Sequence, residues 1–313
     1  MSEGAGATTR EAGALVVTAR APGKINLALE ALGRRSDGYH DIETVITTVE
    51  LSDQLTLRVA SGLRVTIDGP EARGVAGADE LAGRAAQALG SAAGRAPDVA
   101  ITVTKRIPVA AGLGGGSADA AAVLRGLDRL WGLGWPAERL AELGAALGSD
   151  VPALVVGGAT HCSGRGEIVE PLRDLRPLRL LVIAPPVPAP PEKTARRFGA
   201  LGHGDWSDGG RARRLAHRIA RGAPPPTADL ANVFEAVVER TEPELVAHYA
   251  RFARIAGGRL HLCGAGPAVY LFVHEDARVS ELRRELEATG ARVFVTATLG
   301  RAAATAVDVV DAG

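Results

Sequence analysis

The stretch PVAAGLGGGSADAAA, residues 108–122, places four glycines directly before an alanine-rich run. The segment DVAITVT at 98–104 contains β-branched residues typical of a strand, and the alanines after Ser117 favour a helix. Glycines let a backbone approach a ligand closely, and a helix N-terminus presents free N–H groups to a phosphate. The stretch therefore predicts a strand, a phosphate-binding loop and a helix that begins near Ser117.

Two other phosphate-binding loops do not fit this stretch. A Walker A loop needs a lysine after its last glycine, and the dinucleotide loop needs the spacing G-x-G-x-x-G with an acidic residue for a ribose. A run of glycines is also compatible with an ordinary tight turn. The hydroxyl of Ser117, which could reach a phosphate oxygen or a magnesium ion, favours the phosphate loop.

Strand-like segments fill the first quarter of the chain. Ile25, Leu27 and Leu29 alternate with more polar residues, as in a strand, so Lys24 and Asn26 should project from the same face. We expect further strands at 44–51, 54–60, 63–68, 178–186, 259–264, 268–273 and 292–299, strand-like structure around 155–172, and further helices at 78–93, 136–148, 228–239, 242–256 and 277–289.

The pattern indicates an α+β protein with two halves. We expect a flexible tail at 1–15, an N-terminal domain at 16–175 that contains the glycine loop, and a C-terminal domain at 176–313. Between the proline-rich segments 185–191 and 223–227 lies what we expect to be the least regular part of the chain.

The composition excludes some modes of binding. The 313 residues contain 36 basic and 36 acidic side chains, so bulk charge does not favour nucleic acid or a membrane surface. No apolar run is long enough to span a bilayer, and no targeting segment is visible, which favours a cytoplasmic protein. Cys162 and Cys263 lack metal-ligand or disulfide spacing and are expected to be reduced core thiols.

Three further features suggest chemistry. Lys24 is one of only three lysines in an arginine-rich chain. In LGSDVP, Pro152 disfavours continuation of a helix, so Asp150 should lie at an element end where it can face a cleft. Gly264 and Gly266 form a turn between two strands. Taken singly, these could be a surface lysine, a helix cap and a hairpin turn.

Together these stretches resemble the GHMP small-molecule kinases. The similarity runs from about residue 19 to about residue 299, through APGKINLALEALGRRSDGYHDIETV, PVAAGLGGGSADAAA, LGSDVPALVVGGATHCSGRGE and LCGAGPAVYLF. It implies a two-lobed fold, with an N-terminal half like ribosomal protein S5, a ferredoxin-like C-terminal half, and ATP and substrate in the cleft between them. GKINL, GRRSDGYH and GSDVP are similar to the branch that phosphorylates the 2-hydroxyl of a cytidine diphosphate ester of methylerythritol, in the non-mevalonate isoprenoid pathway.

The resemblance implies two catalytic residues and an ATP site. Asp150 would accept the proton of the 2-hydroxyl, and Lys24 would keep Asp150 ionised and favour an alkoxide-like oxygen. An ammonium is a compact charge that fits between a carboxylate and a hydroxyl, as a forked guanidinium does not. ATP with Mg²⁺ would be bound, without a dedicated metal site, by Lys105, Pro108, Ala110, Gly112, Leu113, Gly114, Gly115, Gly116 and Ser117. Lys105 could instead be a solvated strand end.

The resemblance also implies a substrate site. Tyr39 would stack on the cytosine ring, His40 would contact it largely through its backbone, and Phe198 would cover the other side, unless Phe198 is a core aromatic. The full set is Asn26, Tyr39, His40, Phe198, Gly264, Ala265 and Gly266. The only partner expected is the small-molecule substrate, with no nucleic acid or membrane, and the protein would be a monomer or a weak homodimer.

The chain departs from the family pattern at several positions. Lys193 and the pair Cys263 and Ala265 replace serines, Val233 replaces an acid, and Glu80 replaces an asparagine. Two hydroxyls that could bind substrate phosphate are therefore missing. The alternatives are a GHMP kinase for another small alcohol, such as a mevalonate-type or homoserine-type substrate, or a catalytically silent sensor that binds a nucleotide or a sugar.

Overall fold

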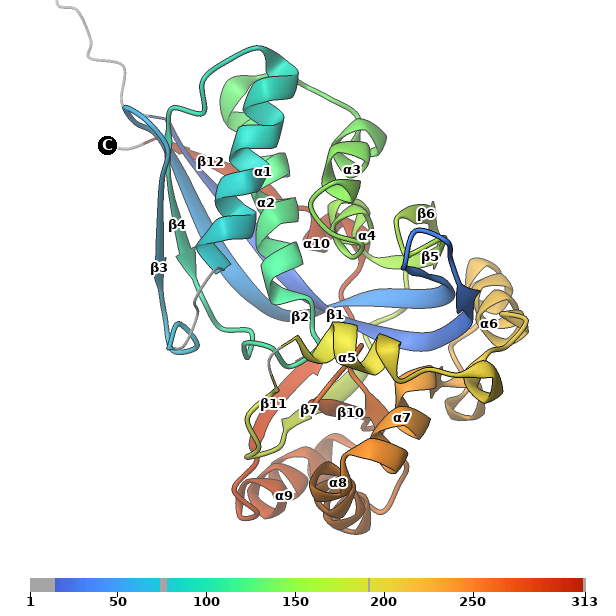
Figure 1. Ribbon diagram of the computed structural model, residues 1–313. Coiled ribbons are helices and arrows are strands. Elements are labelled where there is room, and N and C mark those ends of the chain that lie inside the picture. The colour runs from blue at the N-terminus through green and yellow to red at the C-terminus, as the bar shows by residue number, and fades with distance from the viewer. Residues whose placement is uncertain (1–14, 74–77, 191, 312–313) are drawn as a thin grey trace, which may run out of the picture.

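The computed structural model describes residues 15–73, 78–190 and 192–311, with only the backbone of 78–80 and 311. Two lobes meet at a central junction (Figure 1). The expected tail at 1–15 lies outside the described residues except for Leu15, which begins the first strand. The α+β class and the two-lobed architecture are confirmed.

The first lobe is built on a long hairpin. Strands β1 (Leu15–Arg34) and β2 (His40–Val59) pair antiparallel in a sheet with the order β12-β1-β2-β4-β3. Its other members are β3 (Arg64–Asp68), β4 (Val99–Thr104), β5 (Ala159–Ser163), β6 (Ile168–Pro171), β8 (Ala231–Asn232) and β12 (Val307–Asp311). The helices of this lobe are α1 (Ala78–Ala93), α2 (Gly115–Trp131), α3 (Ala137–Ala145), α4 (Val151–Val156) and α10 (Arg301–Ala304).

The second lobe has an antiparallel sheet with the order β11-β7-β10-β9. Its strands are β7 (Arg179–Ala184), β9 (His261–Leu262), β10 (Val269–Phe272) and β11 (Arg292–Ala297). The helices α7 (Val233–Thr241), α8 (Pro243–Ala256) and α9 (Asp276–Glu287) lie beside this sheet, as Figure 1 shows.

Strand β1 is buried on both faces where the lobes meet. Every residue from Ala21 to Leu29 is buried, although alternation predicts one covered face. Ile25 and Leu27 pack into a hydrophobic cluster with Tyr270 of the second sheet, while the other face points into the junction. The tyrosine hydroxyl donates to the carbonyl of Asn26 at 2.9 Å.

The chain does not divide cleanly into halves. The expected boundary at 175 falls between β6 and β7, where the chain passes from the first sheet to the second. Strands β8 and β12 nevertheless return to the first sheet and both pair with β1. Strand β12 therefore places the last described residues beside the first described ones.

The region expected to be least regular contains two helices. Helices α5 (Lys193–Gly199) and α6 (Gly210–Ala220) lie within it, and α5 lies at the junction of the lobes (Figure 1). The apolar face of α6 repeats at helical spacing, through Ala212, Leu215, Ala216 and Ile219. Its arginines and the flanking prolines obscure that pattern in the sequence.

Candidate active site

A cavity of about 840 Å³ opens between the lobes. Its volume is that of a small-molecule binding site, and its wall receives residues from β1, β2, the glycine loop, α5 and the turn before β10. Of the residues expected in the site, the wall contains Lys24, Asn26, Tyr39, His40, Lys105, Pro108, Ala110, Gly112, Leu113, Gly114, Gly115, Gly116, Ser117, Asp150, Phe198, Gly264 and Ala265. Gly266 lies off the wall.

The glycine loop ends in the N-terminus of α2. Gly114 is the N-cap residue with φ 70° and offers no side chain to cap the helix. The first-turn N–H groups lack intrahelical acceptors and remain available for an anion. The helix begins at Gly115, so two of the expected loop glycines belong to its first turn. A Cβ on Gly115 would lie 3.3 Å from Ile107 and one on Gly116 would lie 3.3 Å from Leu81.

Lys24, Asn26 and Asp150 meet at the centre of the cavity. The Lys24 ammonium donates to Asn26 Oδ1 at 2.8 Å and lies 3.4 Å from Asp150 Oδ2. Asn26 in turn donates to the hydroxyl of Thr44 at 2.8 Å. Lys24 is buried and not a surface residue. As the alternation predicts, Lys24 and Asn26 share one face of β1.

Asp150 occupies the N-cap position of α4 without acting as a cap. Its side chain makes no hydrogen bond to the helix it precedes, Pro152 lies in the first turn, and the carboxylate is 36% exposed. The carboxylate is therefore free to face the cavity. The Asp150 carboxylate thus has a positive neighbour and faces the cavity.

Two glycines allow the backbone to come this close. A Cβ on Gly114 would lie 3.2 Å from Lys24 Cγ and 3.6 Å from Asp150 Oδ2. A Cβ on Gly264, where φ is 51°, would lie 2.8 Å from the Lys24 ammonium and 2.7 Å from the carbonyl oxygen of Gly112. The loops of both lobes therefore confine Lys24.

The turn that contains Gly264 is held from three sides. Asn232 donates to the carbonyl of Gly264 at 2.8 Å, and Tyr249 donates to that of Pro267 at 2.6 Å. Arg197 donates to the carbonyl of Ala265 and forms a two-point ion pair with Glu242. Gly266 lies off the cavity wall because it packs inward, where a Cβ would lie 2.7 Å from Arg197 Nη1.

Lys105 lies beneath the glycine loop in a buried charged cluster. Its ammonium bonds to Asp53 and, at 2.6 Å, to Asp119 Oδ2, so it is not a solvated strand end. Asp53 also accepts from the backbone N–H of Ile107 at 2.8 Å, which anchors the start of the loop. Burial raises the pKa of Asp119 to about 8, with Lys105 acting in the opposite direction. Asp119 Oδ1 has no hydrogen-bond partner among the described residues.

Aromatic rings also line the cavity. The rings of His40 and Phe198 stack with centroids 5.1 Å apart, and Phe198 packs edge-on against Phe234 at 4.8 Å. Phe198 is thus both a wall residue and part of the core. Burial lowers the pKa of His40, and the charge of Arg34 adds to this. Tyr39 is 51% exposed, and the Arg165 guanidinium lies 4.9 Å from its ring centroid.

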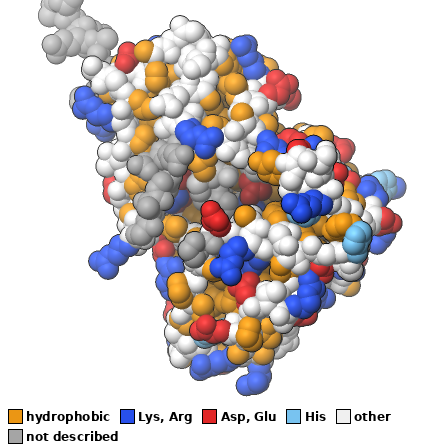
Figure 2. All heavy atoms as spheres, in the orientation of Figure 1, with side chains coloured by type: hydrophobic (Ala, Val, Ile, Leu, Met, Phe, Trp, Pro, Cys, Tyr) orange, Lys and Arg blue, Asp and Glu red, His pale blue; other side chains and the backbone are white. Residues whose placement is uncertain are grey.

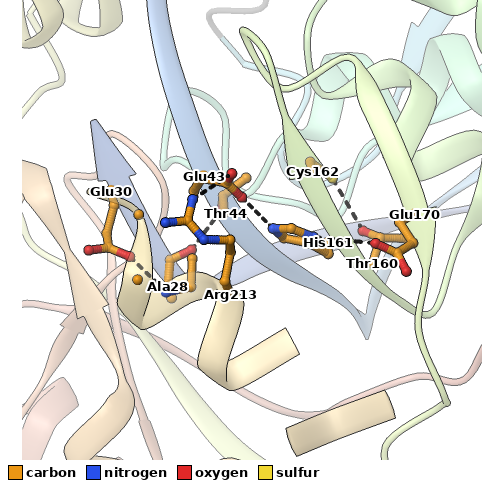
Figure 3. A network of polar contacts seen from close by, with 12 residues as sticks. Ala28, Glu30, Glu43, Thr44, Thr160, His161, Cys162, Glu170 and Arg213 are labelled. Carbon is orange, nitrogen blue, oxygen red and sulfur yellow. Dashed lines mark hydrogen bonds and ion pairs between the residues drawn. The ribbon is translucent and has the colours of Figure 1, made fainter. Parts of the chain in front are cut away.

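A polar network secures the strands that hold this site. Glu43 accepts a bond from His161 on β5 and pairs with Arg213 of α6 at 3.2 Å (Figure 3). Glu43 precedes Thr44, so the two side chains leave opposite faces of β2. The N-terminal end of α6 is held in turn by Glu30, which accepts from the N–H of Ala212 at 2.7 Å. No local pattern predicts this network, because its members are distant in sequence.

Both cysteines of the chain lie in the core. Cys162 and Cys263 are free and buried, as expected, and burial raises the pKa of each thiol to about 12. Within 15–73, 78–190 and 192–311, no helix is long and apolar enough to cross a membrane, and no cluster of three or more His, Cys, Asp or Glu could hold a metal ion. Basic and acidic side chains are intermixed over the face in Figure 2.

The chain is similar to known kinases over most of its length. The GHMP kinases N-terminal domain family matches residues 80–158. A 4-diphosphocytidyl-2-C-methyl-D-erythritol kinase of Moorella thermoacetica is 40% identical, and one of Dehalococcoides mccartyi (strain ATCC BAA-2266 / KCTC 15142 / 195) is 35% identical. Each alignment covers 91% of this chain and 99% of the relative.

Solved structures agree with this similarity. The crystal structure of a 4-(cytidine 5'-diphospho)-2C-methyl-D-erythritol kinase has a TM-score of 0.73 at 31% identity, over 90% of this chain and 100% of that one. A homoserine kinase from Cytophaga hutchinsonii has a TM-score of 0.70 at 14% identity, over 97% of this chain and 99% of that one. At that identity the second likeness concerns the fold alone.

Proposed function

Because the chain belongs to the 4-diphosphocytidyl-2-C-methyl-D-erythritol kinases of the GHMP superfamily, we propose that it phosphorylates the 2-hydroxyl of that cytidine diphosphate ester with ATP. The protein is a small-molecule kinase. The observation that supports the reaction best is the pair of Asp150 and Lys24, which lie 3.4 Å apart in the cavity and beside the N-terminus of α2.

The proposed reaction needs an acceptor for the hydroxyl proton and charge stabilisation at the transferring phosphoryl group. Asp150 accepts the proton, since its carboxylate is not engaged as a helix cap. The ammonium of Lys24 attracts the oxygen that loses the proton. Asn26 holds that ammonium in place, and Thr44 holds Asn26.

The phosphates of ATP are proposed to lie on the glycine loop. The first-turn N–H groups of α2 point toward an anion bound there. Lys105 acts through the loop rather than on the phosphates, because Asp53 and Asp119 already occupy its ammonium.

The residues present fit a magnesium ion bound with ATP. Ser117 lies on the cavity wall, and a Cβ on Gly148 would be 3.8 Å from its hydroxyl oxygen, beside the segment of Asp150. Ser117 would hold the ion together with phosphate oxygens, since Mg²⁺ commonly takes few protein ligands. The ion neutralises charge on the phosphates when bound.

The test is coupled ADP release with Mg-ATP and the cytidine diphosphate ester. We expect turnover by the native chain and a loss of at least about 10²-fold in Asp150→Asn. Asp276→Asn is the matched control, because Asp276 is 75% exposed and far from the cavity wall. It should retain native turnover.

Each of the other assay results would favour a different interpretation. Native-like turnover in Asp150→Asn would remove that carboxylate from the mechanism. An inactive native chain would contradict the proposed substrate, and turnover with mevalonate or homoserine would then identify another alcohol. Tight ATP binding without turnover on any of these alcohols would indicate a nucleotide sensor.

A further inference from the structure

Lys193 is a cation on the cavity wall that the reaction described above does not use. It is the first residue of α5, a helix at the junction of the lobes (Figure 1). Its side chain lines the cavity together with Lys24 and Asp150. In the described part of the chain, its ammonium makes no hydrogen bond or ion pair. The other two lysines differ, since Lys24 is bound to Asn26 and Lys105 to two carboxylates.

The surroundings of Lys193 disfavour its charge. Burial and, to a smaller extent, the charges of Arg197 and Lys24 lower its pKa from 10.5 to about 8. Asp150 and Cys263 act in the opposite direction. A largely buried cation without a partner costs free energy, so the folded protein gains no stability from this ammonium. A ligand with a negative charge in the cavity would supply the missing partner.

The charged residues on the cavity wall favour an anionic ligand. Lys24 and Lys193 together face one carboxylate, Asp150, whereas Lys105 is matched by two acids of its own. This part of the wall therefore has excess positive charge and suits a phosphate group. The neighbouring turn offers no hydroxyl to such a group, because its wall residues are Gly264 and Ala265 and the thiol of Cys263 is buried.

We propose that the ammonium of Lys193 binds the diphosphate of the substrate, in place of hydroxyls that the turn at 263–266 lacks. The proposal rests on the proposed function. Under that function, the substrate hydroxyl that reacts lies at Asp150, and the cytosine at the other end of the substrate lies at the rings of His40 and Phe198. Phe198 lies five residues beyond Lys193 in α5, which corresponds to roughly 7.5 Å along the helix axis. The diphosphate joins the two ends of the substrate, and Lys193 lines the same cavity as the residues at both ends.

The decisive comparison is Lys193→Met, which keeps the apolar stem and removes the charge. Arg196→Met is the matched control, since Arg196 is exposed on the same helix and away from the cavity wall. We expect Lys193→Met to raise KM for the cytidine diphosphate ester about ten- to hundredfold, the range of a hydrogen bond to a charged group. KM for ATP should stay within about twofold, and Lys193→Arg should recover part of the loss.

The pH profile gives a second readout. Native KM for the ester should rise as the pH passes about 8, because Lys193 loses its proton there. The same profile in Lys193→Met should lack this rise. A rise in KM for ATP instead of the ester would assign the ammonium to the ATP phosphates and overturn the proposal. Unchanged KM for both would also overturn it.

Binding measurements, which need no turnover, test the role of Lys193 independently of the proposed reaction. Calorimetry with cytidine 5′-diphosphate and with cytidine should show that the native chain prefers the diphosphate. Lys193→Met should lose most of that preference, and Arg196→Met should keep it. If the native chain lacks turnover, the proposed function fails, but the binding comparison still tests the role of Lys193. An equal preference for the diphosphate in Lys193→Met and in the native chain would contradict that role.

Discussion

Gly114→Ala tests whether the glycine loop positions Lys24. Gly114 has φ 70°, so a side chain there should cost about 1–2 kcal/mol of unfolding free energy. The added Cβ would lie 3.2 Å from Lys24 Cγ and 3.3 Å from its Cε. Lys24 must then shift by a few tenths of an ångström, away from its 3.4 Å approach to Asp150. A displacement of 1 Å can cost about 10²-fold in rate, so we expect kcat to fall about tenfold.

Gly132→Ala is the matched control, at the other end of α2. Gly132 also has positive φ, at 64°, but a Cβ there would meet nothing within 4 Å. Both variants should lose similar stability in urea unfolding. In coupled ADP release at saturating substrates, only Gly114→Ala should lose kcat. Equal kcat in the two variants would refute the claim that this loop sets the position of Lys24.

Three further predictions follow from buried charges. Lys24→Arg should lower kcat by about 10²-fold or more despite its retained charge, because the ammonium site between Asn26 and Gly264 leaves no room for a guanidinium; near-native kcat in a stopped assay would contradict this. Burial raises the pKa of Asp119 to about 8 although its carboxylate pairs with Lys105, so the ionised form of Asp119 costs free energy in the folded state. The loss of unfolding free energy that Asp119 causes in the native chain should therefore grow from about pH 4 to about pH 8. In urea unfolding, the stability of Asp119→Asn relative to the native chain should increase over this pH range, and a decrease would contradict the prediction. Lys193→Met should stabilise the protein at pH 7, by up to about 3 kcal/mol for a shift of its pKa from 10.5 to about 8. Because the pKa of Lys193 is lowered in the folded state, its charge destabilises the native chain fully below about pH 8, and this destabilisation disappears as the pH rises to about 10.5. Thermal unfolding should therefore show Lys193→Met as more stable than the native chain at pH 7 but not at pH 10.5.

Local patterns in the sequence were sufficient to predict the glycine loop and the face of β1 that carries Lys24 and Asn26. Glycine permits positive φ, as at Gly112 and Gly114, and alternation places Lys24 beside Asn26. Asp150 was also predictable as a residue at an element end, because Pro152 restricts the backbone that follows it. The family resemblance added catalytic and binding roles, and those roles stay predictions.

Nonlocal contacts decided the rest. The sequence does not indicate that Lys105 meets Asp53, 52 residues away, or that Glu43 meets His161, 118 residues away. Nor does it indicate that the Lys193 ammonium forms no ion pair within the described residues, which follows from how α5 packs across the junction of the lobes. Periodicity and glycine content reflect the local preferences of the backbone, whereas the partner of a buried charge depends on which distant segments fold against it. The sequence by itself therefore determined the elements and the motifs of this kinase, and only the tertiary structure decided which of its charges are paired and which remain available for a ligand.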